Sequence, residues 1–331
     1  MALSASVGCR RSPVLSPFVH LKQTHLNRKG QAMRCGFIGL GNLGVHLAAS
    51  LLRAGLMVTV HDKERRTADQ LVEAGALWAD SLIALAEQSN VIFTCLPSPQ
   101  VSETVLDGFL KFCGPDMTWI EMSTIGRSEI LRLAGKASER GVTTLEVPVT
   151  GGVHLAAKGK LTLLAAGDAE VFDRFLPVLQ TMGDQIFYMG PLGNAAVIKV
   201  ITNMLAFIHL IADGEALMLA KCGGLDLAQA WRAIKASSGN SFVHETEGQL
   251  ILNGSYDVGF TMDLAVKDLG FAIDFGRILG VPLNLAALTN EIFVKGKEIY
   301  GGTAQSTQIV KLLEDTLGEN LRADGFPARL E

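Results

Sequence analysis

Between Arg34 and Gly190 the sequence repeats one pattern, in which a short apolar run and a turn precede residues with helical spacing. The apolar runs predict strands at Cys35–Ile38, Val58–His61, Val91–Cys95, Trp119–Met122 and Thr144–Val147, and two more in LTLLAAG and QIFYM. Helices are predicted between them at Leu43–Arg53, Thr67–Ala74, Ser128–Arg140 and Phe172–Met182. Strands that alternate with helices are typical of an α/β fold with a doubly wound parallel sheet and right-handed crossovers.

The pattern changes after Gly190, where no further strand is predicted. Residues 195–221 are predicted to form one continuous helix, roughly 40 Å long, which ends at a Gly-Gly stop. Further helices are predicted at Ala228–Ala236, Phe260–Leu279, Leu285–Tyr300 and Thr307–Leu317. We therefore expect an α/β domain over residues 33–193, a long interdomain helix and an all-helical C-terminal domain over residues 194–331.

Residues 1–32 differ from the rest of the chain, since they contain Arg, Lys, Ser and Pro but no acidic residue. Such a composition resembles an organelle transit peptide. The alternative is that the fold starts at Met33, where a strand begins at once, and that the preceding Arg-Lys-Gly reflects a purine-rich ribosome-binding site. We expect a leader or disordered extension on a cytoplasmic protein, with organelle import left open.

The bulk composition excludes several classes of protein. At 331 residues a single core would be near its practical limit, which agrees with two domains. The net charge of -4 gives no electrostatic reason to expect nucleic acid. The five cysteines include no C-x-x-C pair, so we expect reduced thiols and no metal. No membrane span is expected, because the uncharged run between Lys199 and Asp213 is shorter than the roughly 20 residues that a span needs.

A glycine-rich turn follows the first predicted strand and opens the first predicted helix. Gly39 permits the tight turn, Gly41 lets a pyrophosphate approach the backbone, and Gly44 allows close packing of the helix on the sheet. The N–H groups and partial positive charge at the helix N-terminus suit the phosphates. In this context the turn predicts a Rossmann dinucleotide site made of Gly39, Leu40, Gly41, Asn42, Leu43 and Gly44.

The second predicted strand is followed by Asp62, where a carboxylate would hold the two ribose hydroxyls and repel a 2′-phosphate. This favours NAD as the cofactor. Lys63, Arg65 and Arg66 follow at once and could clamp such a phosphate, which leaves NADP as the alternative.

Two loops are predicted at the carboxyl edge of the sheet, where open α/β sheets bind ligands. One carries Leu96 and Pro97, which we expect near the cofactor. The other carries Thr124, a candidate contact, and Ser123, which we interpret as a cap for the following helix.

A bound nicotinamide implies hydride transfer, which needs a proton donor or acceptor at the substrate oxygen. Short-chain dehydrogenases use Tyr-x-x-x-Lys, but no lysine lies four residues after any of the three tyrosines. His154, beside a Gly-Gly turn, is a minor candidate, and His209 is interpreted as a core residue. The other five histidines, His244 among them, are assigned to the leader, the cofactor side or polar surroundings.

The long apolar helix contains Lys199, with Asn203 four residues later on the same helix face. Burying an ammonium is costly unless it is paired or its pKa falls. A desolvated lysine can take a proton from a hydroxyl near neutral pH, so Lys199 is the candidate acid/base. The alternative is a lysine whose stem is buried and whose amine reaches water.

A series of ordered motifs gives the chain a resemblance to the β-hydroxyacid dehydrogenase family, which includes 3-hydroxyisobutyrate dehydrogenase and tartronate semialdehyde reductase. The motifs are FIGLGNLG, EMSTI, EVPVTGG, GPLGNAAVIKVITN and AVKDLGFA. The match runs from about Met33 to the C-terminal helices, and motifs in this order are far more specific than any one of them.

The resemblance implies an NAD(P)-dependent oxidoreductase that interconverts a small 3-hydroxy acid and its semialdehyde or keto acid. It implies Lys199 as general acid/base and Asn203 as a substrate-binding residue. It further implies a carboxylate-binding loop and two more cofactor contacts, which are Thr150, Gly151 and Gly152 for the loop, and Thr124 and Lys267 for the cofactor. Dimers or tetramers through the helical domain are also implied. From the residues alone, Lys267-Asp268 could equally be an exposed helix pair.

The sequence departs from the family pattern in the motifs themselves. Thr150 stands where serine is usual, and Asn194-Ala195 follows Gly193 where the family has Gly-x-Gly. Glu121 and Glu146 replace aspartates. These changes keep the reaction class, but the resemblance does not fix the substrate, because pocket shape decides it.

Two other functions compete with this one. An imine reductase shares the long-helix architecture but seldom keeps the lysine, and a non-catalytic nucleotide-binding interaction module tends to lose it. Lys199 argues against both, and the Thr150-Gly151-Gly152 loop argues further against an imine reductase.

Overall fold

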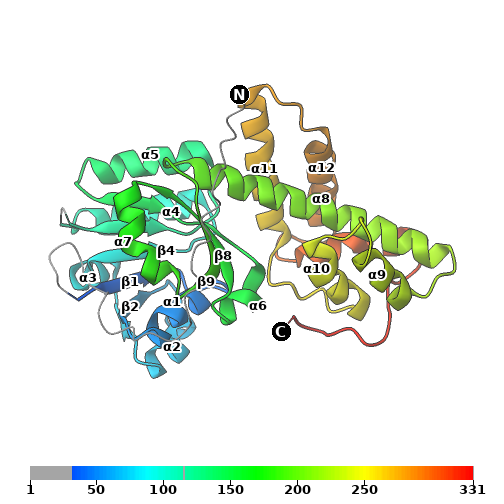
Figure 1. The fold of residues 1–331 in the computed structure, drawn as a ribbon, viewed down its shortest axis with the longest axis horizontal. Helices are drawn as coiled ribbons and strands as arrows, with labels where there is room; N and C mark the ends of the chain where they lie inside the picture. Colours follow the sequence, from blue (N-terminus) through cyan, green and yellow to red (C-terminus); the bar gives the residue numbers. More distant parts are fainter. Residues whose placement is uncertain (1–31, 115, 331) are drawn as a thin grey trace, which may run out of the picture.

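The computed structural model describes residues 32–114 and 116–330, so the predicted leader at residues 1–32 lies almost wholly outside the described residues. The described chain forms two parts, a layered α/β part and a helical part, joined by one long helix (Figure 1). All strands of the described chain lie between Arg34 and Tyr188, and every element after Asn194 is helical. The prediction of an α/β half followed by a helical half is confirmed.

The strands form one nine-stranded sheet in the described chain, in the order β3-β2-β1-β4-β5-β6-β8-β7, with β9 paired to β8. Their bounds are β1 Arg34–Ile38, β2 Met57–His61, β3 Leu77–Trp78, β4 Val91–Thr94, β5 Thr118–Glu121, β6 Thr143–Glu146, β7 Val149–Thr150, β8 Leu161–Gly167 and β9 Gly183–Tyr188. Strands β1 to β6 are parallel to one another, as predicted. The short strands β3 and β7 were not predicted.

The sheet is mainly parallel, as predicted, but one side of it is antiparallel. Strand β8 runs antiparallel to both β6 and β7, while β8 and β9 are parallel to each other. The chain returns from β7 to β8 through only ten residues, 151–160, and a parallel crossover needs a dozen or more. The connection therefore reverses the chain direction instead of crossing over.

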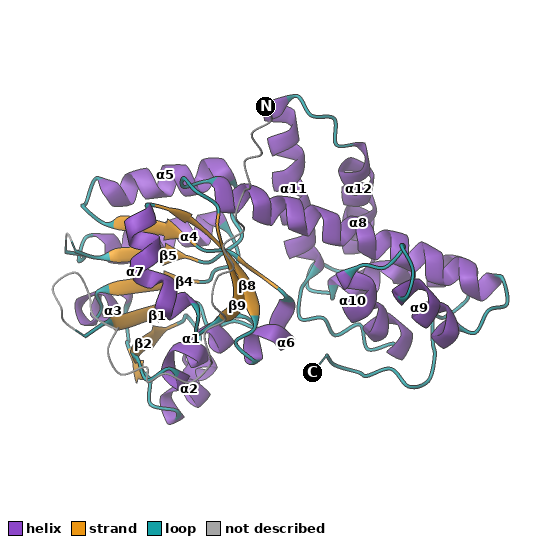
Figure 2. Ribbon diagram, viewed as in Figure 1, coloured by secondary structure: helices purple, strands orange, loops and turns teal. Residues whose placement is uncertain are grey.

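Helices cover both faces of the sheet (Figure 2). One face packs on α1, α2, α6 and α7, and the other on α3, α4 and α5, each through a cluster of buried apolar side chains. Their bounds are α1 Gly44–Arg53, α2 Asp69–Glu73 after the 3₁₀ turn Arg65–Ala68, α3 Leu82–Gln88, α4 Pro99–Leu110, α5 Arg127–Ser138, α6 Gly152–Ala157 and α7 Ala169–Leu179. Since its faces are covered, the sheet meets a ligand at its strand ends.

Helix α8 spans Asn194–Cys222 and joins the two parts. It contacts β8 and α5 at its start and α9 to α12 along its length. Its length and composition alone would allow it to cross a membrane, but these contacts and the buried polar side chains on it, Lys199, Asn203 and Asp213, explain it as the central helix of the fold.

The helical part packs around α8 with a core of its own that includes Phe207, Leu217 and Phe293. Its elements are α9 Leu227–Lys235, α10 Phe242–Asn253, α11 Met262–Leu279, α12 Asn284–Tyr300, the 3₁₀ turn Ser306–Val310 and α13 Lys311–Leu317. Helices α11 and α12 lie against each other and project beyond α8 (Figure 1).

Candidate active site

The glycine-rich turn between β1 and α1 has the shape that a dinucleotide requires. Gly39 has φ +95°, and a Cβ there would lie 2.3 Å from the Cys95 carbonyl oxygen. A Cβ on Gly44 would lie 1.9 Å from the Gly39 carbonyl oxygen. By contrast, a Cβ on Gly41 would meet no described atom within 4 Å, so the space above this residue is open. The turn is therefore packed tightly against the sheet and open where a pyrophosphate would approach.

Helix α1 begins without a side-chain cap. Its N-cap is Leu43, whose side chain cannot accept a hydrogen bond. The Val45 and His46 N–H groups donate to the Gly41 and Leu43 carbonyls at 3.2 and 3.1 Å. No capping side chain therefore competes with a phosphate at this helix end, where the helix dipole favours an anion. The neighbouring Asn42 points elsewhere, because its amide donates to the Gly259 carbonyl of the helical part at 3.3 Å.

Asp62, just past β2, is fixed at the edge of the same turn. One carboxylate oxygen accepts from the Leu40 N–H at 2.7 Å and the other from the Glu64 N–H at 3.0 Å. Arg65 is engaged next to it, in an ion pair with Asp69 at 3.0 Å and 4.7 Å above the Trp78 ring. The Asp62 carboxylate is thus held against the glycine-rich turn, and the Arg65 guanidinium beside it is already paired.

The loops after β4 and β5 are tied together at the carboxyl edge of the sheet. The Leu96 N–H donates to the Ser123 hydroxyl at 2.7 Å, and Pro97 is exposed beside it. The interpretation of Ser123 as a helix cap is wrong, since α5 has Gly126 as its N-cap. Ser123 is buried, and its hydroxyl links the loop after β5 to the loop after β4 instead.

Thr124 is the point at which the helical part meets this edge. Its carbonyl oxygen accepts from the Lys267 amine of α11 at 2.8 Å. The Phe271 ring of α11 packs close to the same loop, because a Cβ on Gly126 would lie 3.4 Å from this ring. Lys267 therefore reaches from the helical part to the loop that the sequence predicted for the cofactor.

The Thr150–Gly152 segment forms the end of β7 and the start of α6. Thr150 pairs with Thr162 of β8, and Gly151 and Gly152 have φ +124° and +81°. A side chain at either position would be strained, because L residues rarely adopt this backbone region. The segment therefore exposes backbone N–H groups in a fixed turn, as a carboxylate-binding loop would need.

Lys199 is buried on α8 and belongs to a chain of polar contacts. Only 7% of the residue is exposed, and its amine donates to the Asn203 side-chain oxygen at 2.6 Å. The Asn203 amide then donates to one carboxylate oxygen of Asp268 at 2.6 Å. The other oxygen of Asp268 lies 2.7 Å from the Lys267 amine, which continues to Thr124. The two predicted residues of α8 are thus linked through α11 to Thr124 at the carboxyl edge of the sheet.

Burial sets the pKa of Lys199. Desolvation is the largest influence and lowers the pKa from 10.5 to about 8, with Lys267 acting in the same direction and Asp268 against it. The amine can therefore exist in both protonation states near neutral pH, which a proton-transfer group requires. The alternative in which this amine reaches water is excluded by its burial.

Asp268 was missed by the sequence reasoning, which left it as half of an exposed pair. It is 1% exposed. The signal was present as an aspartate next to Lys267 in a mostly apolar helix, but its partner Asn203 is 65 residues away in the sequence. Only the packing of α11 on α8 reveals the contact.

Glu146, at the end of β6, holds the start of α8. Its carboxylate accepts from the backbone N–H groups of Gly193, Ala195 and Ala196, the last two at 3.1 Å. Burial raises the pKa of this carboxyl to about 7, against the effect of the backbone donors and of Arg127. A buried carboxylate from the sheet thus fixes the helix that carries Lys199.

The structure places three of the histidines that the sequence analysis considered. His209 is exposed, so its interpretation as a core residue is wrong. His244 is 1% exposed and bonded to Asp213 at 2.5 Å, so its assignment to polar surroundings is wrong as well. His154 lies on α6 next to Gly152, half-buried, and burial followed by Lys158 lowers its pKa. None of the three joins the contacts of Lys199.

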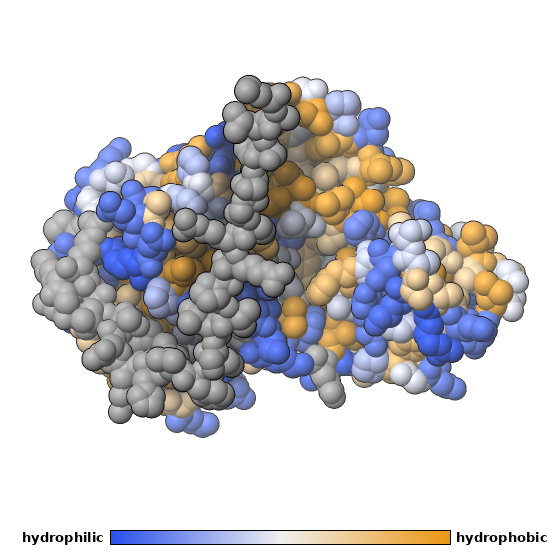
Figure 3. Space-filling view, in the orientation of Figure 1, coloured by the Kyte–Doolittle hydropathy of each residue, from blue (hydrophilic) through white to orange (hydrophobic). Residues whose placement is uncertain are grey.

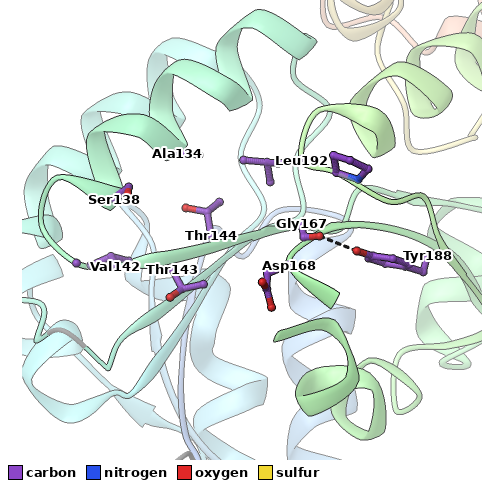
Figure 4. Close-up of a pocket in the computed structure, with 11 residues that line it drawn as sticks. Ala134, Ser138, Val142, Thr143, Thr144, Gly167, Asp168, Tyr188 and Leu192 are labelled. Carbon is purple, nitrogen blue, oxygen red and sulfur yellow. Dashed lines mark hydrogen bonds between the residues drawn. The ribbon is translucent and has the colours of Figure 1, made fainter. Parts of the chain in front are cut away.

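A groove of ≈590 Å³ opens elsewhere on the sheet part (Figure 4). It lies between the end of α5, the start of β6 and the segment before α8, where the Tyr188 hydroxyl donates to the Gly167 carbonyl at 2.8 Å. Thr143 and Thr144 line it at the amino end of β6. No residue predicted for the site lines this groove, so it is separate from the chemistry described above.

Comparisons with known proteins agree with both halves of this arrangement. Residues 34–190 match the family described as the NAD-binding domain of 6-phosphogluconate dehydrogenase. Residues 193–313 match the family described as NAD-binding of NADP-dependent 3-hydroxyisobutyrate dehydrogenase.

Individual proteins are similar over most of the chain. The 2-(hydroxymethyl)glutarate dehydrogenase of Eubacterium barkeri is 32% identical over 87% of this chain and 97% of its own length. The 3-hydroxyisobutyrate dehydrogenase of Pseudomonas aeruginosa is 36% identical over 78% of this chain and 90% of its own. Among solved structures, the 3-hydroxyisobutyrate dehydrogenase of Mycobacterium tuberculosis with L-serine superposes with a TM-score of 0.77 at 27% identity, covering 85% and 99% of the two chains.

Proposed function

Because the chain belongs to the β-hydroxyacid dehydrogenase family, we propose that Lys199 is the general acid/base of an NAD(P)-dependent hydroxyacid dehydrogenase. Oxidoreduction of a small hydroxy acid with a nicotinamide cofactor is the activity of this family. The observation that carries the assignment is the buried amine of Lys199, held by Asn203 and linked to the cofactor edge through Asp268 and Lys267.

The nicotinamide, when bound, accepts the hydride that leaves the substrate carbon. In the direction of oxidation, neutral Lys199 takes the proton of the substrate hydroxyl, and the C–O bond becomes a carbonyl as the C–H bond breaks. In the direction of reduction, the Lys199 ammonium returns this proton to the oxygen. The pKa of about 8 allows both directions near neutral pH.

Asn203 and Asp268 act on the position and charge of the amine. Asn203 accepts from Lys199 and donates to Asp268, so its amide is fixed from both sides. In the proposed site Asn203 also contacts the substrate. The buried Asp268 carboxylate favours the ammonium form of Lys199 and opposes the effect of burial.

We propose a short 3-hydroxy acid, or its semialdehyde, as the substrate. Thr150, Gly151 and Gly152 would hold the substrate carboxylate through the hydroxyl and backbone N–H groups. Support comes from the two positive φ values and from the relatives named above, which are dehydrogenases of such acids by name. Thr150 carries one methyl more than the serine that is usual in the family, which leaves less space for the substrate beside this loop.

NAD is the proposed cofactor, held by the Gly39–Gly44 turn, Asp62, Leu96, Pro97, Thr124 and Lys267. The Asp62 carboxylate is fixed at the turn by Leu40, where it would repel a 2′-phosphate. Arg65 is paired with Asp69 rather than free to bind one.

A cofactor-reduction screen tests these assignments. Short 2- and 3-hydroxy acids are offered to the purified protein with NAD and, separately, with NADP. We expect turnover with a 3-hydroxy acid and NAD, and loss of turnover but not of NAD binding in Lys199→Ala. In Asp62→Ser the preference for NAD should fall. Retained turnover in Lys199→Ala would remove the role given to this residue, and a wild-type preference for NADP would reverse the cofactor assignment.

We further propose that the sheet part (33–193) and the helical part (194–331) act as cofactor and substrate domains, and that copies assemble through the helical one. Apolar side chains gather over α11 and α12 (Figure 3), where Ile278 is 74% and Leu285 65% exposed. A surface of this kind is typical of an interface. Light scattering on the purified protein tests this, with a dimer or tetramer expected. The proposed compartment is the cytoplasm, which fractionation of the source cells would test.

A further inference from the structure

Tyr256 has a strained backbone. Among the described residues it is the only non-glycine residue with positive φ, at 55°. Side chains other than glycine avoid this region, and residues held there mark places where the surroundings fix the chain. Tyr256 stands in the loop Ser255–Thr261, which joins α10 to α11 and is called the α10–α11 loop below.

A buried network holds Tyr256 from the C-terminal side of the chain. Its hydroxyl donates to the Glu314 carboxylate of α13, and both residues are less than 5% exposed. Glu314 also accepts from the Arg322 guanidinium at 2.9 Å, which lies 5.2 Å from the Tyr256 ring. Thr307 donates to the Tyr256 carbonyl at 2.5 Å. Side chain and backbone of Tyr256 are therefore fixed independently.

The C-terminal segment after α13 holds the same loop. Its contacts and those of Glu314 and Thr307 with Tyr256 are together called the brace below. It passes below α9 and α10 in the view of Figure 1. The Leu321 N–H donates to Glu314 at 2.7 Å, and the Arg329 guanidinium contacts Asp257, the next residue of the α10–α11 loop, at 2.9 Å.

The other end of the α10–α11 loop touches the sheet part. The Gly259 carbonyl accepts from Asn42 in the dinucleotide turn at 3.3 Å. A Cβ on Gly259 would lie 3.1 Å from Val153, the residue after the Thr150–Gly152 segment. Gln305 fixes this end by accepting from the N–H groups of Gly259 and Phe260 at 2.9 and 3.2 Å. Three residues beyond Tyr256, the loop thus meets both proposed binding segments.

We infer that Tyr256 is a positioning residue for the cofactor, through which Glu314 and the C-terminal segment hold the α10–α11 loop against Asn42. This inference rests on the proposed function, because it takes the Gly39–Gly44 turn as the cofactor site. The loop contacts the turn through Asn42 and orders it before the cofactor binds. When the brace is weakened, a smaller fraction of molecules is ready to bind, and the apparent dissociation constant rises in proportion.

The test compares Tyr256→Phe with Tyr300→Phe. Tyr300 is the matched control, because its hydroxyl donates at 2.6 Å to Asp315, the neighbour of Glu314, rather than to Glu314 itself. For Tyr256→Phe we expect the NADH dissociation constant, measured by fluorescence titration without substrate, to rise about threefold to tenfold. Deuterium exchange in the cofactor-free protein should become faster at residues 255–261 and 39–44. Tyr300→Phe should change neither quantity.

A milder variant covers the case in which Tyr256→Phe does not fold. Thr307→Val removes only the hydrogen bond to the Tyr256 carbonyl, and a smaller change in the same direction is expected. Wild-type affinity and exchange in either brace variant, or an equal change in Tyr300→Phe, would overturn the inference. If the wild-type protein binds neither NADH nor NADPH, the proposed function fails instead, so the two failures are distinguishable.

Discussion

The two halves of the molecule bury polar groups in different ways. In the sheet part, the buried carboxylates of Glu121 and Glu146 accept hydrogen bonds from backbone N–H groups and a threonine hydroxyl. In the helical part, buried charged groups face one another, as Lys199 and Asp268 do around Asn203. One oxygen of Asp268 there lies 2.7 Å from the Lys267 amine, and one oxygen of Asp213 lacks a hydrogen bond within the described chain.

The two kinds of buried polar group suit different roles, one structural and one chemical. Backbone donors cannot move or lose their protons, so a carboxylate that they hold is a fixed part of the framework. Ionisable side chains that face each other can exchange protons, and each changes the pKa of the next. Removing a buried charge should therefore cost stability in the sheet part, but cost function at Lys199 and Asp268 in the helical part.

The largest expected effect is on turnover in Lys199→Met. Loss of a general acid/base reduces the rate by roughly 10²–10⁴-fold, while NADH binding should persist. The same change removes a buried charge, whose depressed pKa of about 8 corresponds to a cost of the order of 3 kcal/mol below pH 8. Removing this cost should raise the stability of the fold. The Asn203 side-chain oxygen loses its hydrogen-bond donor, however, and this offsets part of the gain. We expect a melting temperature a few degrees higher at pH 7, measured by calorimetry beside the kinetic assay.

Lys221→Met is the matched control for Lys199→Met. This lysine lies on the same helix, but it is partly exposed and paired with Glu319 at 3.4 Å. Turnover and melting temperature should both stay near the wild-type values. A lower melting temperature in Lys199→Met would show that the amine is a net structural contact and would break the contrast between the halves.

The opposite result is expected for Glu146→Leu in the sheet part. Leucine fills a similar volume but leaves three buried N–H groups at the start of α8 without an acceptor. The free energy of unfolding should fall by about 3 kcal/mol, as measured by urea denaturation. Glu170→Leu, an exposed acid in the first turn of α7, serves as control and should cost under about 1 kcal/mol. Equal losses in the two variants would mean that the buried cap is no more important than a surface charge.

A smaller effect concerns the pH profile, since the charged neighbours of Lys199 act in opposite directions. In the wild type, kcat/KM for oxidation should rise with pH and level off above about 8, because the neutral amine is the base. Asp268→Asn removes an influence that raises the pKa of Lys199, so the midpoint should move to lower pH. Lys267→Met removes one that lowers it, so the midpoint should move to higher pH. Each midpoint should move by about one pH unit, and movement of both in the same direction would contradict the network.

The sequence predicted those parts of the site that depend on local spacing. The Gly39–Gly44 turn follows a strand and opens a helix, and Lys199 and Asn203 share one helix face, so periodicity alone brings each set together. Asp268 and Glu146 could not be assigned in this way. Their partners lie 65 and about 50 residues away, and only the packing of α11 and β6 against α8 makes the contacts.

The same reasoning explains the errors in the fold. The reversal of β8 depends on the length of one connection, which a periodicity of apolar residues does not register. Helix α10 was not predicted, although Ser241 caps it, because its buried face includes the polar His244 and the small Gly248 rather than a continuous apolar stripe. Its burial became visible only where it packs on α8, beside Asp213.

The smallest expected effect is a pH dependence of stability from the buried groups around His244. Burial lowers the pKa of His244, but the bonds to Asp213 and to the Trp231 carbonyl outweigh it, and the net change in its pKa is upward. A histidine whose folded pKa is raised stabilises the fold fully below about pH 6.5, and this contribution is lost as pH rises through the folded pKa. A tenfold difference in proton affinity between the folded and unfolded states corresponds to about 1.4 kcal/mol of stability.

Glu247 acts in the same direction, because burial and then Asp213 raise its pKa to about 8, so the folded state holds its proton between pH 4.5 and 8. The free energy of unfolding should therefore fall from pH 6.5 to 8, and Glu247→Gln should remove part of this slope. Combining it with Asp213→Asn and His244→Gln, which leaves no buried charge unpaired, should remove most of the rest while turnover stays near wild type, since this cluster lies apart from Lys199. A slope that survives in the triple variant would place the titrating group elsewhere. A loss of turnover would show that the helical part does not keep its stabilising and reacting charges separate.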